Sequence, residues 1–88
     1  MTTYVTLLRN KTVYILRGRS RSSHYNDISD GLFPPPISIG DRAVATPDYE
    51  VDTMISAQIE GKSKEELRTL VRELIDTRKE SRIAGAAA

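Results

Sequence analysis

The chain has 88 residues, 39% apolar and 28% charged, with no cysteine and a formal net charge of +1. This length fits one small domain at most, the apolar content is too high for a wholly disordered chain, and the lack of cysteine excludes disulfides and thiolate metal sites. No apolar run approaches the roughly 20 residues that a membrane span needs, and the N-terminus does not read as a signal peptide. We therefore expect a cytoplasmic protein without a membrane partner.

The charged residues are unevenly distributed along the chain. Residues 1–46 carry six bases and three acids, a net charge of +3, whereas residues 47–88 carry seven bases and nine acids. Between Arg9 and Arg21 there are five bases and no acid. This asymmetry predicts a basic face on the first half, which an anionic partner such as DNA would favour. The alternative is a solvated surface on which the bases cluster by chance.

The first elements are short. Residues 4–8 are rich in β-forming residues and predict a short strand or an extended arm. A helix is predicted over 11–17, with Asn10 as its N-cap and Gly18 ending it.

A second helix is predicted directly after this turn. Ser20 is its expected N-cap, Tyr25 and Ile28 its inner face, and Gly31 its end. Two helices joined by a turn of about three residues have the form of a helix-turn-helix.

A small β-hairpin is predicted next. The run Pro34-Pro35-Pro36 excludes helix and begins an extended segment. Residues 37–39 and 43–45 then flank a turn at Gly40-Asp41-Arg42. A hairpin that follows a helix-turn-helix is how a wing is built.

A third helix is predicted to begin with Thr46 as N-cap and Pro47 at its first position. Its apolar stripe should pack on the first two helices, and Gly61 should end it. The stripe consists of Val51, Met54, Ile55 and Ile59.

The strongest helical pattern covers residues 64–82. Ser63 and Glu66 fit a capping box, and five apolar residues follow at helical spacing. The stripe either folds back on the domain or pairs with a second copy. We favour a homodimer, since two-fold operators need two DNA-binding heads. The predicted dimerisation residues are Leu67, Leu70, Val71, Leu74 and Ile75.

These patterns predict a DNA-binding domain over residues 1–61, a C-terminal amphipathic helix over 62–83 and a flexible tail over 84–88. Three motifs occur in the first of these parts: S-R-S-x-x-Y from Ser20, G-x-F-P from Gly31 and I-x-I-G-x-R-A-V-A from Ile37. With their flanking residues, over about 7–60, they resemble the AlpA family of phage and prophage regulators, which are small winged helix-turn-helix proteins related to excisionases and to the MerR-type DNA-binding head.

The sequence departs from the family pattern at two positions. The family usually has Trp after the second wing strand, where this chain has Thr46, so the packing under the wing must differ. The family favours an apolar residue where this chain has Arg19, which adds charge on the side expected to face DNA.

The resemblance implies a mainly α fold with a small hairpin, a winged helix-turn-helix that places its second helix in the major groove of double-stranded DNA. Residues at the start of that helix reach base edges, while bases beside it and at the wing tip contact phosphates or the minor groove. His24 is either a DNA contact or a packed or solvent-facing side chain, and Tyr25 is expected mainly in the core, with its hydroxyl as a possible phosphate contact. The predicted DNA-binding residues are Arg9, Lys11, Arg17, Arg19, Ser20, Arg21, Ser22, Ser23, His24, Tyr25 and Arg42.

The resemblance implies a transcriptional regulator of phage or mobile-element genes, with integrase or another phage protein as a possible partner. It also implies a bacterial protein that associates with the nucleoid when bound to DNA. Two alternatives are an excisionase that bends attachment-site DNA, and a protein–protein adaptor that docks through its C-terminal helix. We predict no cofactor and no metal, and no enzymatic activity, because the sequence has no recognisable nucleophile–base pair, phosphate loop or metal-ligand set.

Overall fold

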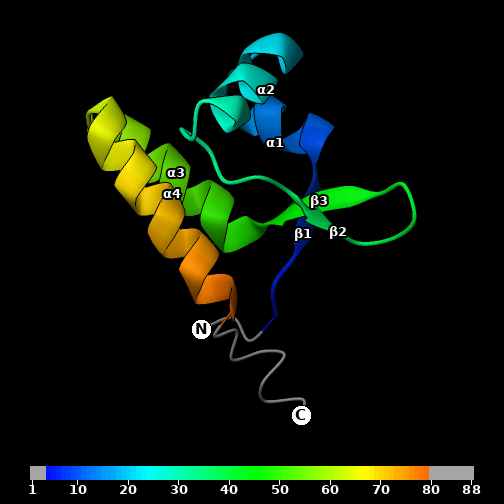
Figure 1. Cartoon of the computed structure of the whole chain (residues 1–88). Coiled ribbons are helices and arrows are strands. Elements are labelled where there is room, and N and C mark those ends of the chain that lie inside the picture. The colour runs from blue at the N-terminus through cyan, green and yellow to red at the C-terminus, as the bar shows by residue number, and fades with distance from the viewer. Residues whose placement is uncertain (1–3, 80–88) are drawn as a thin grey trace.

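The computed structural model of the protein describes residues 4–79 (Figure 1). The predicted winged helix-turn-helix is confirmed: the first two helices form the helix-turn-helix, and a hairpin forms the wing. The elements are β1 (Leu7–Arg9), α1 (Asn10–Leu16), α2 (Arg21–Ser29), β2 (Ile37–Ser38), β3 (Val44–Pro47), α3 (Asp48–Ile59) and α4 (Lys64–Lys79).

The sheet has β3 in its centre, paired antiparallel with β1 on one side and β2 on the other. The predicted hairpin is therefore present, and the N-terminal segment is a strand that adds a further edge. Leu8 lies opposite Thr46, and Ile37 lies opposite Ala45. The pairing with β1 extends into the start of α3, because the Asp48 N–H donates to the Thr6 carbonyl at 2.8 Å. In Figure 1, α3 and α4 lie side by side, and the β2–β3 loop projects away from them.

Two predicted helix starts are wrong by one residue. Asn10 is the first residue of α1 rather than its N-cap, and α3 begins at Asp48 with Pro47 as N-cap. The reason is strand pairing, because β1 and β3 remain paired up to both helix starts and hold Thr46 within the sheet. Thr46 is buried there, at the position where the family usually has Trp.

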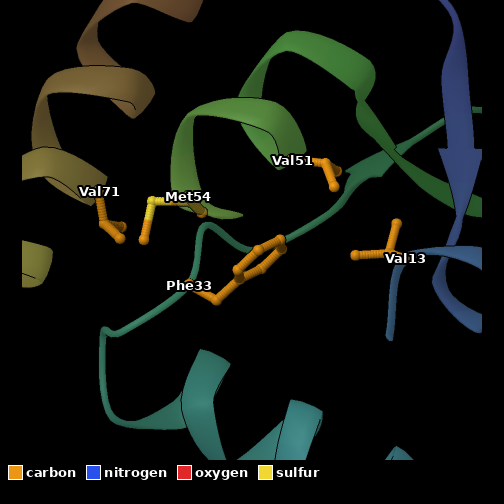
Figure 2. Close-up of a cluster of buried hydrophobic side chains, with 5 residues drawn as sticks. All are labelled: Val13, Phe33, Val51, Met54 and Val71. Atoms are coloured by element: carbon orange, nitrogen blue, oxygen red, sulfur yellow. The ribbon is translucent and has the colours of Figure 1, made fainter. Parts of the chain in front are cut away.

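The core is small and centred on Phe33. In Figure 2 the Phe33 ring lies among Val13, Val51, Met54 and Val71, which together come from α1, α3, α4 and the segment after α2. Ile59, predicted to belong to the apolar stripe of α3, is instead 80% exposed. It is the last residue of α3, and the chain turns toward α4 directly after it.

The C-terminal helix packs on its own domain. Ser63 and Glu66 form the predicted capping box: the Ser63 N–H donates to Glu66 Oε1 at 2.8 Å, and the Glu66 N–H donates to Ser63 Oγ at 3.2 Å. The hydrogen bond from the Ser63 N–H to the carboxylate is the main cause that lowers the pKa of Glu66, and the Ser63 side chain lowers it further. The described part of this helix ends at Lys79, so the predicted residues 80–82 lie outside the described residues. No helix within residues 4–79 combines the length and the apolar character needed to cross a membrane.

The stripe predicted for dimerisation contacts the core of the same chain. Val71 is buried within the core, and the other four side chains are half-buried against it. The fold-back alternative therefore describes α4 in this structure. These four side chains are Leu67, Leu70, Leu74 and Ile75.

A buried ion pair fixes the far end of α4. Glu50 on α3 is fully buried, and its two carboxylate oxygens accept from Arg78 Nε at 2.8 Å and Nη2 at 2.6 Å. Arg78 Nη2 also donates to the Pro35 carbonyl at 2.7 Å, so one guanidinium joins α3, α4 and the proline run. This contact was not predicted from the sequence, because Glu is usually a surface residue and the two partners are far apart in the chain.

Arg78→Ala should lower the free energy of unfolding by about 3–5 kcal/mol, because it leaves the buried Glu50 carboxylate without its partner. Urea unfolding followed by circular dichroism measures the change. Arg72→Ala is the matched control: Arg72 is exposed on the same helix, and its loss should cost less than about 1 kcal/mol. Equal, small losses from both variants would contradict the role assigned to the ion pair.

Candidate nucleic-acid interface

The turn between α1 and α2 is set by local signals. Gly18 has φ +69°, a left-handed conformation that glycine adopts at little cost. Its N–H donates to the Ile15 carbonyl and the Arg19 N–H donates to the Tyr14 carbonyl, which together end α1 in a Schellman motif. Ser20 then caps α2, as predicted, because its Oγ accepts from the Ser23 N–H at 3.1 Å.

The turn is tied to α2 by a network around Asp27. The Asp27 carboxylate accepts from Arg17 Nη2 at 2.9 Å. It also accepts two bonds from Arg19, from Nε at 3.0 Å and from Nη2 at 2.9 Å. Arg17 further donates from Nη1 to His24 Nδ1 at 2.8 Å and lies with its Cζ 4.2 Å from the Phe33 ring centroid.

This network removes two residues from the predicted DNA contacts. The Arg17 side chain is only 3% exposed, which contradicts its predicted role as a phosphate contact. His24 is fully buried, so of the alternatives given for it the packed side chain describes this structure. Arg19 remains 38% exposed in its side chain, but its guanidinium is held by Asp27. The charge that Arg19 adds relative to the family pattern is therefore largely directed inward.

Tyr25 lies on the surface rather than on the predicted inner face. It is 41% exposed, and the inner side of α2 is formed instead by His24, Asp27 and the half-buried Ile28. The prediction considered only apolar side chains for the inner face, and the structure turns the helix so that the His24 ring packs 5.1 Å from the Phe33 ring.

The outer side of α2 is polar. Arg21, Ser22 and Tyr25 are exposed there, as are Asn26 and Ser29, while Ser23 is half-buried at the capped end. Asn26 was not among the predicted site residues, which within α2 ended at Tyr25. Its position four residues after Ser22 places both on one helix face, and this spacing was the available signal.

The exposed Tyr25 is held by two neighbours. Its hydroxyl accepts a hydrogen bond from Asn10 Nδ2 at 3.2 Å, which connects the start of α1 to α2. The Arg21 Cζ lies 5.3 Å from the Tyr25 ring centroid, within the range of a cation–π contact. Arg9 and Lys11, on either side of Asn10 in the chain, are both exposed.

The wing carries one exposed cation at its tip. Arg42 lies in the loop between β2 and β3, where the Ile39 N–H donates to the Ala43 carbonyl at 2.9 Å and the Ser38 hydroxyl donates to the Gly40 carbonyl at 3.1 Å. In Figure 1 this loop projects on the side of α1, away from α3 and α4.

His24 is held in its neutral form. Burial lowers the pKa of its imidazole, and the positive charge of Arg17 lowers that pKa further. Because a guanidinium only donates, Nδ1 accepts and the ring proton lies on Nε2, which has no hydrogen-bond partner among residues 4–79. Burial also lowers the pKa of Arg17, although the hydrogen bond with Asp27 and its negative charge act in the opposite direction.

The free energy of unfolding should fall as the pH drops below about 6.5, the pKa of an unfolded His. In that range the His24 side chain binds a proton in the unfolded chain but not in the folded one. Its contribution to stability is therefore present above about pH 6.5 and is lost as the pH falls, with a slope of up to about 1.4 kcal/mol per pH unit. Urea unfolding between pH 5 and 8 measures it. His24→Asn keeps an acceptor toward Arg17 and should flatten this slope; an unchanged slope would contradict the assignment.

Comparison with known proteins places the chain in a family. The family model described as Prophage CP4-57 regulatory protein (AlpA) matches residues 6–59, which cover β1 through α3 and include the whole helix-turn-helix and wing. No curated protein and no solved structure matches the chain. On the match over these residues, the chain belongs to the AlpA family of prophage regulatory proteins.

Proposed function

We propose that the protein is a sequence-specific DNA-binding transcriptional regulator of phage or prophage origin, with α2 in the major groove and the wing on the flanking groove or backbone. The observation that carries this proposal is the division of α2 into two sides. Its inner side is anchored by Asp27, which binds Arg17 and Arg19. Its outer side presents exposed polar side chains that take no part in this network. Recognition helices are built in this way.

The outer side of α2 has the chemistry to read bases. Arg21 can pair with the O6 and N7 atoms of guanine, and Asn26 with the N6 and N7 atoms of adenine. Ser22 can bond to either a base or a phosphate. We therefore assign base contacts to Arg21, Ser22 and Asn26, of which Asn26 is added by the structure.

Phosphate contacts are assigned to exposed cations outside this face. Arg42 at the wing tip and Arg9 and Lys11 at the start of α1 are exposed, and exposed cations of this kind favour the DNA backbone. We prefer DNA binding to the adaptor alternative, because the apolar stripe of α4 packs against the core of its own chain. An excisionase would use the same head, so the location of its sites decides between it and a regulator.

Titration of random duplex DNA at roughly 50 and 200 mM salt tests DNA binding itself, since affinity for a charged backbone falls steeply with salt. The protein should bind at low salt and lose affinity at high salt; no binding at low salt would exclude the proposal. Footprinting on phage DNA then separates the two roles. A protected operator over a promoter indicates a regulator, and spaced repeats in an attachment region indicate an excisionase.

Arg21→Ala and Arg42→Ala should have different effects. Once a preferred site is known, Arg21→Ala should reduce the preference for that site by about 1–3 kcal/mol, because it removes a base contact. Arg42→Ala should weaken binding to all sequences similarly and reduce the slope of log affinity against log salt by about 1. Competition binding at several salt concentrations measures both quantities. The same loss of preference from both variants would refute the assignment of Arg21 to bases.

A further inference from the structure

Asn10 and Tyr25 form a contact that neither the fold nor base reading requires. They are 15 residues apart, on α1 and α2, and the Asn10 amide donates from Nδ2 to the Tyr25 hydroxyl at 3.2 Å. The other end of the amide is enclosed: Asn10 Oδ1 is buried and has no hydrogen-bond partner among residues 4–79. The hydrogen bond of the amide among these residues is thus the one that Nδ2 donates to the exposed Tyr25.

This contact sets the direction of the hydroxyl proton. A phenol oxygen accepts hydrogen bonds and carries one proton to donate. Because the Tyr25 oxygen accepts a hydrogen bond from Asn10, its own proton points away from Asn10 and is available to donate to another acceptor. An exposed hydroxyl arranged in this way is a donor for an external group.

The surroundings favour an anionic acceptor. The guanidinium of Arg21 lies over the Tyr25 ring at 5.3 Å, and the exposed Arg9 and Lys11 flank Asn10 in the chain. Asp27, the acidic residue nearest to Tyr25 in the sequence, is turned inward to two arginines. A phosphate diester combines a negative charge with oxygens that accept from hydroxyl donors, and Tyr side chains commonly contact DNA phosphates.

We propose that Asn10 is a positioning residue that directs the Tyr25 hydroxyl to donate a hydrogen bond to a phosphate of the DNA backbone. This inference rests on the proposed function. Asn10 itself does not touch DNA in this arrangement; it acts through Tyr25.

A double-mutant cycle on random-sequence duplex DNA tests the proposal. Tyr25→Phe should reduce affinity about tenfold, the low end for a hydrogen bond to a charged group. Asn10→Ala should reduce it by a smaller factor, because the hydroxyl remains but is no longer directed. The double variant should bind as Tyr25→Phe does, because Asn10 has no effect without the hydroxyl. The salt slope should remain that of the wild type in all three, since no charge is removed.

Controls separate this role from a structural one. Tyr49→Phe removes a hydroxyl from α3 and should leave affinity unchanged, and thermal unfolding reports whether each variant is folded. Asn10→Ser is too short to reach Tyr25 and should repeat the result of Asn10→Ala. Two results would overturn the inference even if the wild type shows salt-dependent binding. One is a loss of affinity in the double variant equal to the product of the two single losses, and the other is wild-type affinity in Tyr25→Phe. Absence of binding by the wild type would instead refute the proposed function.

Discussion

In the helix-turn-helix, one carboxylate receives two guanidinium groups. Asp27 on α2 binds Arg17 and Arg19 from the turn, and Arg17 continues the network to His24. The apolar contact between the two helices is slight, because α1 has seven residues and Val13 is the one that is buried. Charge-assisted hydrogen bonds, which are short and directional, therefore contribute much of what fixes α2 relative to the turn. Removing one partner of such a network leaves the others buried without compensation, which is costlier than losing an exposed ion pair.

The same network decides which charges face outward. Five bases between Arg9 and Arg21 suggest a uniformly basic surface, but Arg17 and Arg19 neutralise Asp27 and support the turn. The neutral form of His24 fits this environment, because a protonated imidazole would be repelled by the neighbouring guanidinium of Arg17. The outward charge is then carried by residues at separate positions, at the start of α2, beside α1 and at the wing tip.

In the other half of the molecule, one buried ion pair has a similar role. Glu50 and Arg78 join α3, α4 and the proline run around a core of few apolar side chains. A chain of this size buries relatively little surface, and α4 adds Val71 and its half-buried neighbours to that core. The apolar face of α4 is thus directed largely at the core of its own chain. The polar partners of this small core thus determine how its outermost helix is placed.

The sequence alone determined the features that depend on neighbours a few residues apart. The cap at Ser20, the capping box of Ser63 and Glu66, the turn at Gly18 and the wing hairpin are local, because their hydrogen bonds join residues that are close in the chain. The motifs also led to the right family. Tertiary structure alone decided the rotation of α2, which buries His24 and exposes Tyr25, and the inward direction of Arg17. It also decided that α4 packs on its own core. Each of these rests on contacts between distant segments, such as Arg17 with Phe33 and Glu50 with Arg78, and such contacts leave no periodic pattern in the chain.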